Sequence, residues 1–161
     1  MSEAKHLAEA LTGFLLEEEN GWFLPAVQAL EGLSAEQAAR SPGEKFNSPW
    51  MVLRHMIFWM EFFHLKFSGN VLETDHEEDW LPIVDSSDEE AFAADKDRLA
   101  TAAREIADTV AGWSDEQLDE SFLRDGHNRR HVIQGMIAHN SYHTNEIISV
   151  RHMMGYWLEQ T

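Results

Sequence analysis

The sequence predicts an all-α protein, a four-helix bundle formed by a single domain that spans residues 1–161. Four segments place apolar residues at the 3.6-residue helical period, and no segment alternates convincingly at the two-residue period of a strand. A chain of 161 residues is long enough for a hydrophobic core of its own, and a hydrophobic content of 43% is ordinary for globular proteins. The long linkers between the segments allow one or more crossover connections in the bundle.

The first helical segment covers residues 2–30. Glycines and Pro25 interrupt it, so we expect a kink or a break near residues 20–25. Downstream, Ser34 and Gln37 have the spacing of a capping box, in which a serine hydroxyl and a glutamine side chain each satisfy a free backbone N–H. This pattern predicts a short helical turn after the first segment.

The second segment has the clearest start in the chain. Ser48 can cap the helix, Pro49 suits the first helical position, and Trp50 opens a long apolar run. The run should end at Ser-Gly-Asn, residues 68–70. We therefore expect a helix of about five turns whose first residues are fixed by the Ser-Pro pair.

The third and fourth segments follow longer linkers. Ser87 and Glu90 have the spacing of another capping box, which predicts the start of the third helix, and Gly112 should end it. The fourth helix is expected to begin between residues 128 and 131 and to run to about Leu158.

Charge and composition exclude several kinds of partner. The chain carries 12 Lys and Arg against 29 Asp and Glu, a formal net charge of −17, which repels phosphate backbones and anionic bilayers. Nucleic acid and membrane surfaces are therefore not expected as partners. The acid-rich stretch 73–97 is expected to be a solvated loop and helix face without a site. The absence of cysteine excludes disulfides and thiolate chemistry from the chain itself and fits a cytoplasmic location.

The most apolar stretch also argues against a membrane protein. Residues 50–67 are long enough to cross a bilayer, but they include several titratable side chains that a lipid-facing helix tolerates poorly. The N-terminus lacks the cationic start and apolar core of a signal peptide. Both features fit a helix buried in a protein bundle.

The candidate functional residues lie in the sequence HNSYHTNE, residues 139–146. At about 100° per residue, His139, His143 and Glu146 fall within a sector of roughly 80° on an otherwise apolar stripe. Intervening polar residues such as Asn140 are expected to point elsewhere. Two histidines one helical turn apart on one face have the geometry of a helical metal site, although a single inward histidine is more often a hydrogen-bonded core residue.

A third histidine is expected to face the core from the second helix. His55 lies on the face that carries Phe58, Trp59 and Phe62, whereas His64 falls on the opposite side and is expected at the surface. Three histidines with an open fourth position are typical of catalytic metal centres. The spacing of His127 and His131 is the same as that of the pair on the fourth helix. The adjacent Arg129 and Arg130 make their position unfavourable for a divalent cation.

Two stretches resemble the signature helices of a known family. SPWMVLRHMIFWMEFF (48–63) and HNSYHTNEIISVRHMMGYW (139–157) are similar to those of the DinB-like superfamily, which includes the YfiT-like metal-dependent hydrolases. The resemblance implies a four-helix bundle with up-down-down-up topology. It also implies a divalent metal, zinc or nickel, with His55, His139 and His143 in the ligand positions, and it suggests a homodimer.

One position departs from the family pattern. Many members have Gly-Gln after the second histidine, where this chain has Asn145-Glu146. The carboxylate of Glu146 could be a fourth ligand, a hydrogen-bond partner of a ligand or a catalytic general base, and the sequence does not rank these roles.

Three functions remain open at this point. The first is a hydrolase in which the metal activates water for attack on a small molecule, with Glu146 accepting a proton. The aromatic residues around His55, with Tyr142 near the rim, favour an apolar substrate. The second is a transferase or isomerase that uses a low-molecular-weight thiol at the same metal. The third is a structural or regulatory bundle without turnover, in which Glu146 completes a four-ligand site.

Overall fold

The computed structural model describes residues 2–17, 24–73 and 79–158, and within these ranges the regular secondary structure is entirely helical. The predicted all-α class is confirmed. Ser121 and Asn128 form an isolated bridge between two short loop segments. Four long helices make up the body of the bundle: α1 (Glu3–Leu16), α4 (Pro49–Phe67), α5 (Glu89–Ala111) and α7 (Arg129–Met153). Three short helices lie at its ends: α2 (Ala26–Ala29), α3 (Ala35–Ala38) and α6 (Asp115–Asp119).

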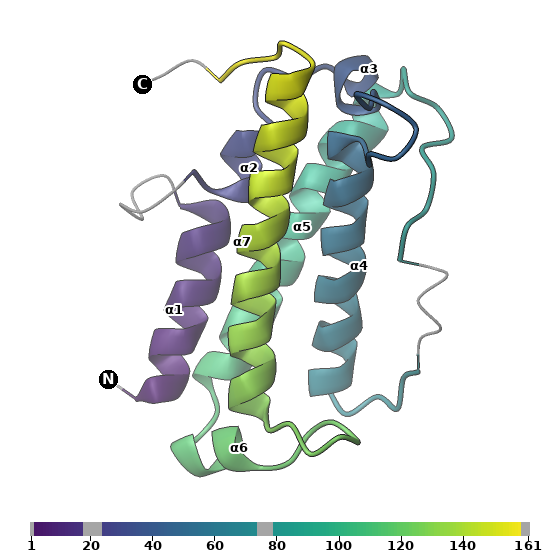
Figure 1. The fold of residues 1–161 in the computed structure, drawn as a ribbon. Coiled ribbons are helices and arrows are strands. Elements are labelled where there is room, and N and C mark those ends of the chain that lie inside the picture. Colours follow the sequence, from purple (N-terminus) through teal and green to yellow (C-terminus); the bar gives the residue numbers. More distant parts are fainter. Residues whose placement is uncertain (1, 18–23, 74–78, 159–161) are drawn as a thin grey trace.

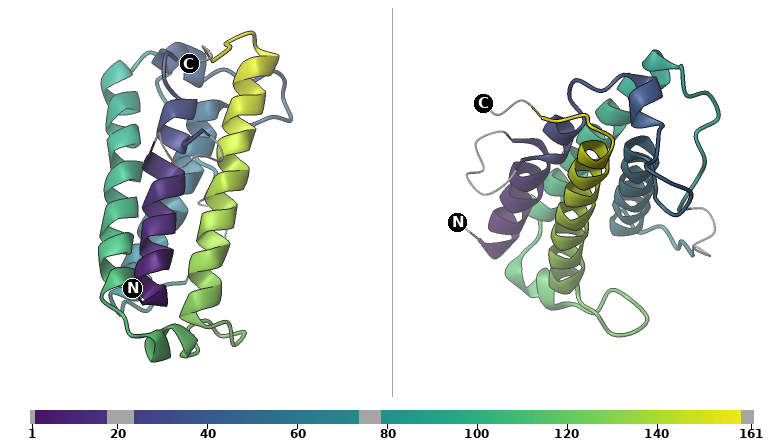
Figure 2. Two further views of the ribbon diagram at one scale, coloured as in Figure 1. Left: turned by 90° about the vertical axis from the view of Figure 1, so that its left-hand side faces the viewer. Right: turned by 45° about the horizontal axis from the view of Figure 1, so that its top comes forward.

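The long helices are arranged so that each packs against two neighbours. α1 contacts α5 and α7, and α4 contacts the same two helices from the other side. In Figure 1, α1 and α7 run upward while α4 and α5 run downward. Figure 2 shows α1 between α5 and α7 when the bundle is seen from the side. Because α4 and α5 run in the same direction, the chain between them must return along the bundle, and residues 79–88 rise beside α4.

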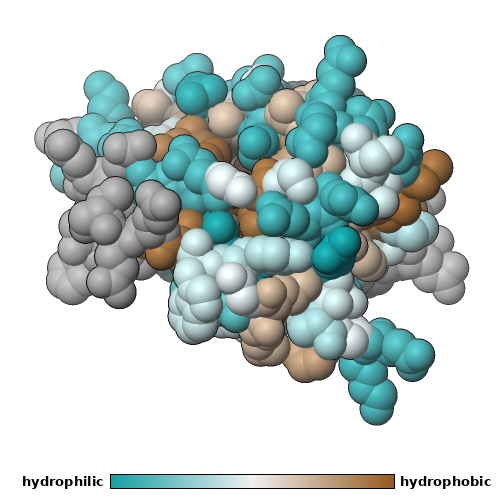
Figure 3. Space-filling model, turned by 90° about the horizontal axis from the view of Figure 1, so that it is seen from above, coloured by the Kyte–Doolittle hydropathy of each residue, from teal (hydrophilic) through white to brown (hydrophobic). Residues whose placement is uncertain are grey.

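The core consists mainly of aliphatic and methionine side chains from all four long helices, together with the rings of Trp50 and Phe92. Leu11 of α1, Leu53 and Met56 of α4, Ile106 of α5 and Ile133 of α7 are almost completely buried. Burial of each such side chain contributes about 1.5–3 kcal/mol relative to leaving it in water. At the end of the bundle where α7 finishes, hydrophilic residues predominate on the surface with smaller hydrophobic patches between them (Figure 3). Within the described residues, no helix has the length and hydrophobicity needed to cross a membrane.

The start of α4 agrees with the sequence prediction. The hydroxyl of Ser48 accepts a hydrogen bond of 3.2 Å from the backbone N–H of Met51, and Pro49 occupies the first helical position. The predicted capping box at Ser34 and Gln37 is also present, and it begins α3. The Ser-Pro pair therefore fixes where α4, the helix that carries His55, begins.

The break in the first segment occurs earlier than predicted. α1 ends at Leu16, and α2 begins at Ala26 after Pro25. Residues 18–23, which include the beginning of the predicted kink near residues 20–25, lie outside the described residues.

The predicted capping box at Ser87 and Glu90 is wrong. Asp88 caps α5, because its carboxylate accepts the N–H of Ala91 at 2.8 Å. The hydroxyl and the N–H of Ser87 both donate instead to the carboxylate of Asp85, at 2.7 and 2.9 Å. Ser87 is thus held in a local turn before the helix begins.

The last helix is shorter than predicted, since α7 ends at Met153 and not near Leu158. Gly155 adopts a left-handed conformation with φ of 82°, and the N–H of Tyr156 donates to the carbonyl of Arg151. Glycine is the residue that adopts this conformation most readily at a helix end. The buried Arg151 guanidinium donates to the carbonyls of Ala29 and Glu31, so it ties the end of α7 to the region of α2.

Candidate metal centre

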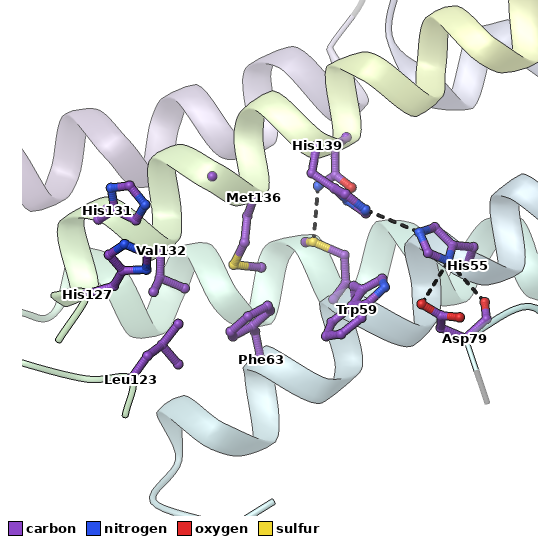
Figure 4. A pocket seen from close by; sticks show the side chains of 13 residues that line it. His55, Trp59, Phe63, Asp79, Leu123, His127, His131, Val132, Met136 and His139 are labelled. Atoms are coloured by element: carbon purple, nitrogen blue, oxygen red, sulfur yellow. Dashed lines mark hydrogen bonds and ion pairs between the residues drawn. The ribbon is translucent and has the colours of Figure 1, made fainter. Parts of the chain in front are cut away.

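The three predicted ligands come together in the upper half of the bundle. His55 extends from α4, and His139 and His143 extend from adjacent turns of α7. One ring nitrogen of each lies within 4.8 Å of the other two, and among the described residues this cluster contains only the three histidines. The Nε2 atoms of His55 and His139 are 3.2 Å apart, and Figure 4 shows the two rings facing each other.

His55 is fixed from two sides by the segment that follows α4. Its Nδ1 lies 3.0 Å from the backbone oxygen of Asp79, and the ring of Trp80 stacks on it with 3.9 Å between centroids and an interplanar angle of 11°. A carbonyl can only accept, so Nδ1 carries the proton and Nε2 keeps its lone pair. The free nitrogen is the one that faces His139.

These contacts correct the expectation for the acid-rich stretch 73–97. Residues 74–78 lie outside the described residues, but Asp79 is buried and both it and Trp80 border the histidine cluster. The local composition gave no signal for this, apart from a tryptophan within a run of acidic residues. The contact depends on the path of the returning chain, which a helical pattern does not specify.

Glu146 fixes the third histidine in the same way. One carboxylate oxygen lies 2.7 Å from Nδ1 of His143, three residues earlier on α7, and the other accepts a hydrogen bond from the amide of Asn47 at 3.4 Å. The contact with His143 lowers the pKa of Glu146, so the carboxylate stays ionised. Glu146 therefore contacts the outer nitrogen of His143 and leaves Nε2 as its free nitrogen.

Burial favours the uncharged forms of His55 and His139. Desolvation, together with like-charge repulsion from the neighbouring His143 and His55, lowers the pKa of His139 to about 4. Desolvation also lowers the pKa of His55. Neutral imidazoles offer lone pairs, which is the state that a metal ion requires of its ligands.

A cavity of about 470 Å³ lies between α4 and α7 and ends at His55 and His139 (Figure 4). Its walls are mostly apolar, with Trp59, Met60 and Phe63 on α4 and Val132 and Met136 on α7. Of the aromatic residues expected around His55, Trp59 lines this cavity. Phe58, Phe62 and Tyr142 are not among its lining residues, and Phe63 takes part instead.

Asn140 does not point away from the site as expected. Its side chain is buried and lines the cavity, and its Nδ2 donates to the sulfur of Met60 at 3.2 Å. Its Oδ1 is buried without a hydrogen-bond partner among the described residues. α7 packs against both α1 and α4, so its buried arc is wider than the sector that carries the histidines.

Three other histidines, His64, His127 and His131, lie outside the cluster. His64 pairs with Glu105 at 2.8 Å. The rings of His127 and His131 stack with 4.0 Å between centroids, and both line the far end of the same cavity. The sequence pattern predicted only that this pair is a poor metal site. The four-residue interval, which continues from His131 through position 135 to His139, was the available signal that His131 lies on the same side of α7 as His139.

The fold and the site together define a helical bundle with a buried three-histidine cluster that could bind a divalent metal. The family model of the DinB superfamily matches residues 26–147, which is most of the chain. The protein therefore belongs to the DinB superfamily, as the resemblance of its two signature helices indicated. No curated protein and no solved structure matches the chain significantly.

Proposed function

We propose that the protein is a metal-dependent hydrolase whose zinc or nickel ion is held by His55, His139 and His143. The observation that carries the proposal is the convergence of one ring nitrogen from each histidine to within 4.8 Å, at the end of a largely apolar cavity. Three imidazoles with an open position are typical of catalytic sites, whereas structural sites usually have four protein ligands.

The surroundings of the cluster fit a metal. Ligating histidines generally donate their other N–H to a carbonyl or carboxylate, which fixes the ring and raises its basicity. His55 has such a contact with the carbonyl of Asp79, and His143 has one with the carboxylate of Glu146. A cation bound by three imidazoles lowers the pKa of a coordinated water to about 7 and polarises a substrate carbonyl.

The remaining residues have separate tasks in this proposal. Glu146 orients His143, and a role as general base or fourth ligand would require it to leave that contact. Met60 and Phe63 exclude water from the apolar part of the substrate.

The alternatives fit the site less well. A sugar-conjugated thiol would need polar or cationic walls, but those between the two ends of this cavity are mainly apolar. A structural site would need Glu146 as the fourth ligand, but its carboxylate contacts Nδ1 of His143. The homodimer suggested by the resemblance and the cytoplasmic location stay predictions.

The test begins with metal analysis of the purified protein. We expect about one zinc or nickel ion per chain, a loss of most of it in His55→Ala, and no loss in His64→Ala, which removes a histidine of the same helix that lies outside the cluster. Hydrolysis of a panel of esters and amides with apolar acyl groups should disappear after chelation and return with the metal. Unchanged metal content in His55→Ala, or hydrolysis that survives chelation, would overturn the proposal.

A further inference from the structure

The cavity connects the histidine cluster to a second pair of histidines at its far end. His131, Gly135, His139 and His143 follow one another at four-residue intervals on α7, so they form an oblique row on the helix surface. The first three form the edge of α7 that lines the cavity. His131 and His139 are eight residues apart, which corresponds to about 12 Å along the helix axis. Figure 4 shows His127 and His131 at one end, His55 and His139 at the other, and apolar side chains between them.

Gly135 lies at the middle of this edge and lines the cavity. Glycine destabilises a helix interior relative to alanine, so it calls for a reason. Gly135 is not among the glycines with positive φ, and a Cβ built on it would meet no atom within 4 Å. Neither backbone conformation nor close packing therefore requires glycine here, and its lack of a side chain leaves open space inside the cavity.

The far end of the cavity is polar. His127 and His131 are both exposed at this end, and Nδ1 of His127 lies 3.1 Å from the carboxylate of Asp125, which holds the ring in place. The section between the two ends is apolar and is formed by Leu123, Val132 and other hydrophobic side chains. The cavity thus has a histidine-lined end on each side of an apolar section.

We propose that this cavity binds an elongated amphipathic substrate, with its reacting group at the His55–His139–His143 cluster, an apolar chain over Gly135 and a hydrogen-bonding polar group at His127 and His131. The placement of the reacting end rests on the proposed function. The assignment of the apolar chain and of the polar end rests on the cavity itself, which exists whether or not a metal is bound.

Binding of three hydroxamates to the full-length, zinc-loaded protein tests this assignment without any measurement of turnover. Hydroxamates coordinate divalent cations, so each probe places its head at the cluster. Acetohydroxamic acid carries the head alone, octanohydroxamic acid adds an apolar chain, and suberic monohydroxamic acid ends the same chain in a carboxylate. Titration calorimetry should show that both long probes bind more tightly than the short one. The carboxylate-ended probe should bind about tenfold more tightly than the methyl-ended one.

Two variants test whether the differences in affinity among the three probes arise in the cavity. His131→Ala should remove the advantage of the carboxylate-ended probe and leave the methyl-ended one unchanged. Gly135→Leu should weaken both long probes by about tenfold or more without affecting acetohydroxamic acid. A leucine at this position meets no protein atom at its Cβ and favours the helix. The melting temperature of Gly135→Leu should therefore not fall below that of the wild type. Ala138→Leu, at an exposed position of α7, is the matched control and should bind all three probes normally.

The outcomes separate this inference from the proposed function. Two results with the metal-bound protein would show that the inference is wrong while leaving the metal centre unaffected. In the first, the long probes bind no more tightly than acetohydroxamic acid. In the second, the methyl-ended probe binds as tightly as the carboxylate-ended one. If the purified protein holds no metal, the proposed function fails. The two long probes are then titrated against the metal-free protein, where dependence on Gly135 and His131 supports the inference and its absence overturns it.

Discussion

Glu146 lies in the same sector of α7 as the two histidines, yet its carboxylate turns to Nδ1 of His143 and not to the centre of the cluster. The helical angle of a residue could be predicted from the sequence, but the direction of a side chain with several rotatable bonds could not. The hydrogen bond orients the ring and increases its electron density, so its effect should appear in the metal affinity.

Replacement of Glu146 by alanine should lower the affinity for zinc by about 10–100-fold, because His143 loses the partner that orients its ring. Glu146→Gln should recover part of the loss, since an amide oxygen can still accept the Nδ1–H. Competition with a chromophoric chelator measures these affinities. Glu105→Ala removes the carboxylate of the other close histidine–glutamate pair, with His64, and serves as the control. Equal affinities in Glu146→Ala and Glu105→Ala would contradict the assigned role.

The partly buried His139 makes the stability of the metal-free protein depend on pH. Its pKa is about 4 when folded and about 6.5 when unfolded, so between these values the unfolded chain binds more protons. The free energy of unfolding should therefore be unaffected by this group above pH 6.5 and should fall as the pH falls from 6.5 towards 4. Urea denaturation across this range should show a steeper fall for the wild type than for His139→Gln. Parallel profiles would show that burial of His139 does not shift its pKa.

At the scale of helices, beginnings were predicted better than ends. The Ser48-Pro49 pair defines the start of α4 because one residue supplies a cap and the next has a fixed φ. The start of α5 was misplaced by one residue because Ser87 and Asp88 are both good caps, and only the contact with Asp85 decides between them. For α7, Gly155 was the available stop signal, and it ends the helix before the apolar pattern does.

The two serines give a direct test of capping. Ser48→Ala should lower the free energy of unfolding by about 1 kcal/mol. The side chain of Ser48 is buried, and without its hydroxyl the N–H of Met51 loses its acceptor. Ser87→Ala should change it by less than about 0.5 kcal/mol, since Ser87 is exposed and does not cap α5. Urea denaturation of both variants measures the difference. A larger loss in Ser87→Ala than in Ser48→Ala would contradict the assigned caps.

At the scale of the whole molecule, the features that could be predicted from the sequence are those that depend on the helical period of its apolar residues. The all-α class and the inward faces of His55, His139 and His143 follow from 100° per residue, which needs no knowledge of the neighbours. The contacts of Asp79 with His55, and the cavity itself, depend on how distant segments meet. No local pattern in the sequence encodes those contacts.

A metal that binds only the folded chain should stabilise the whole molecule. At a free metal concentration of 100 times its dissociation constant, the gain is about 2.7 kcal/mol. Scanning calorimetry should therefore show a lower melting temperature after chelation and recovery when zinc is added. His64→Ala should show the same shift, whereas His55→Ala should show little or none. A metal-dependent shift of full size in His55→Ala would place the ion elsewhere.

The cavity also separates two helices that are otherwise neighbours. α4 and α7 enclose it, whereas hydrophobic side chains fill the core between the other helices, so the α4–α7 boundary is expected to open most easily in local fluctuations. An ion held by His55 on one side and by His139 and His143 on the other would join the two helices across this boundary. Amide hydrogen exchange should then slow on zinc addition, and the slowing should be larger in α4 and α7 around these residues than in α1 and α5. The site would thus act as a removable cross-link between two helices.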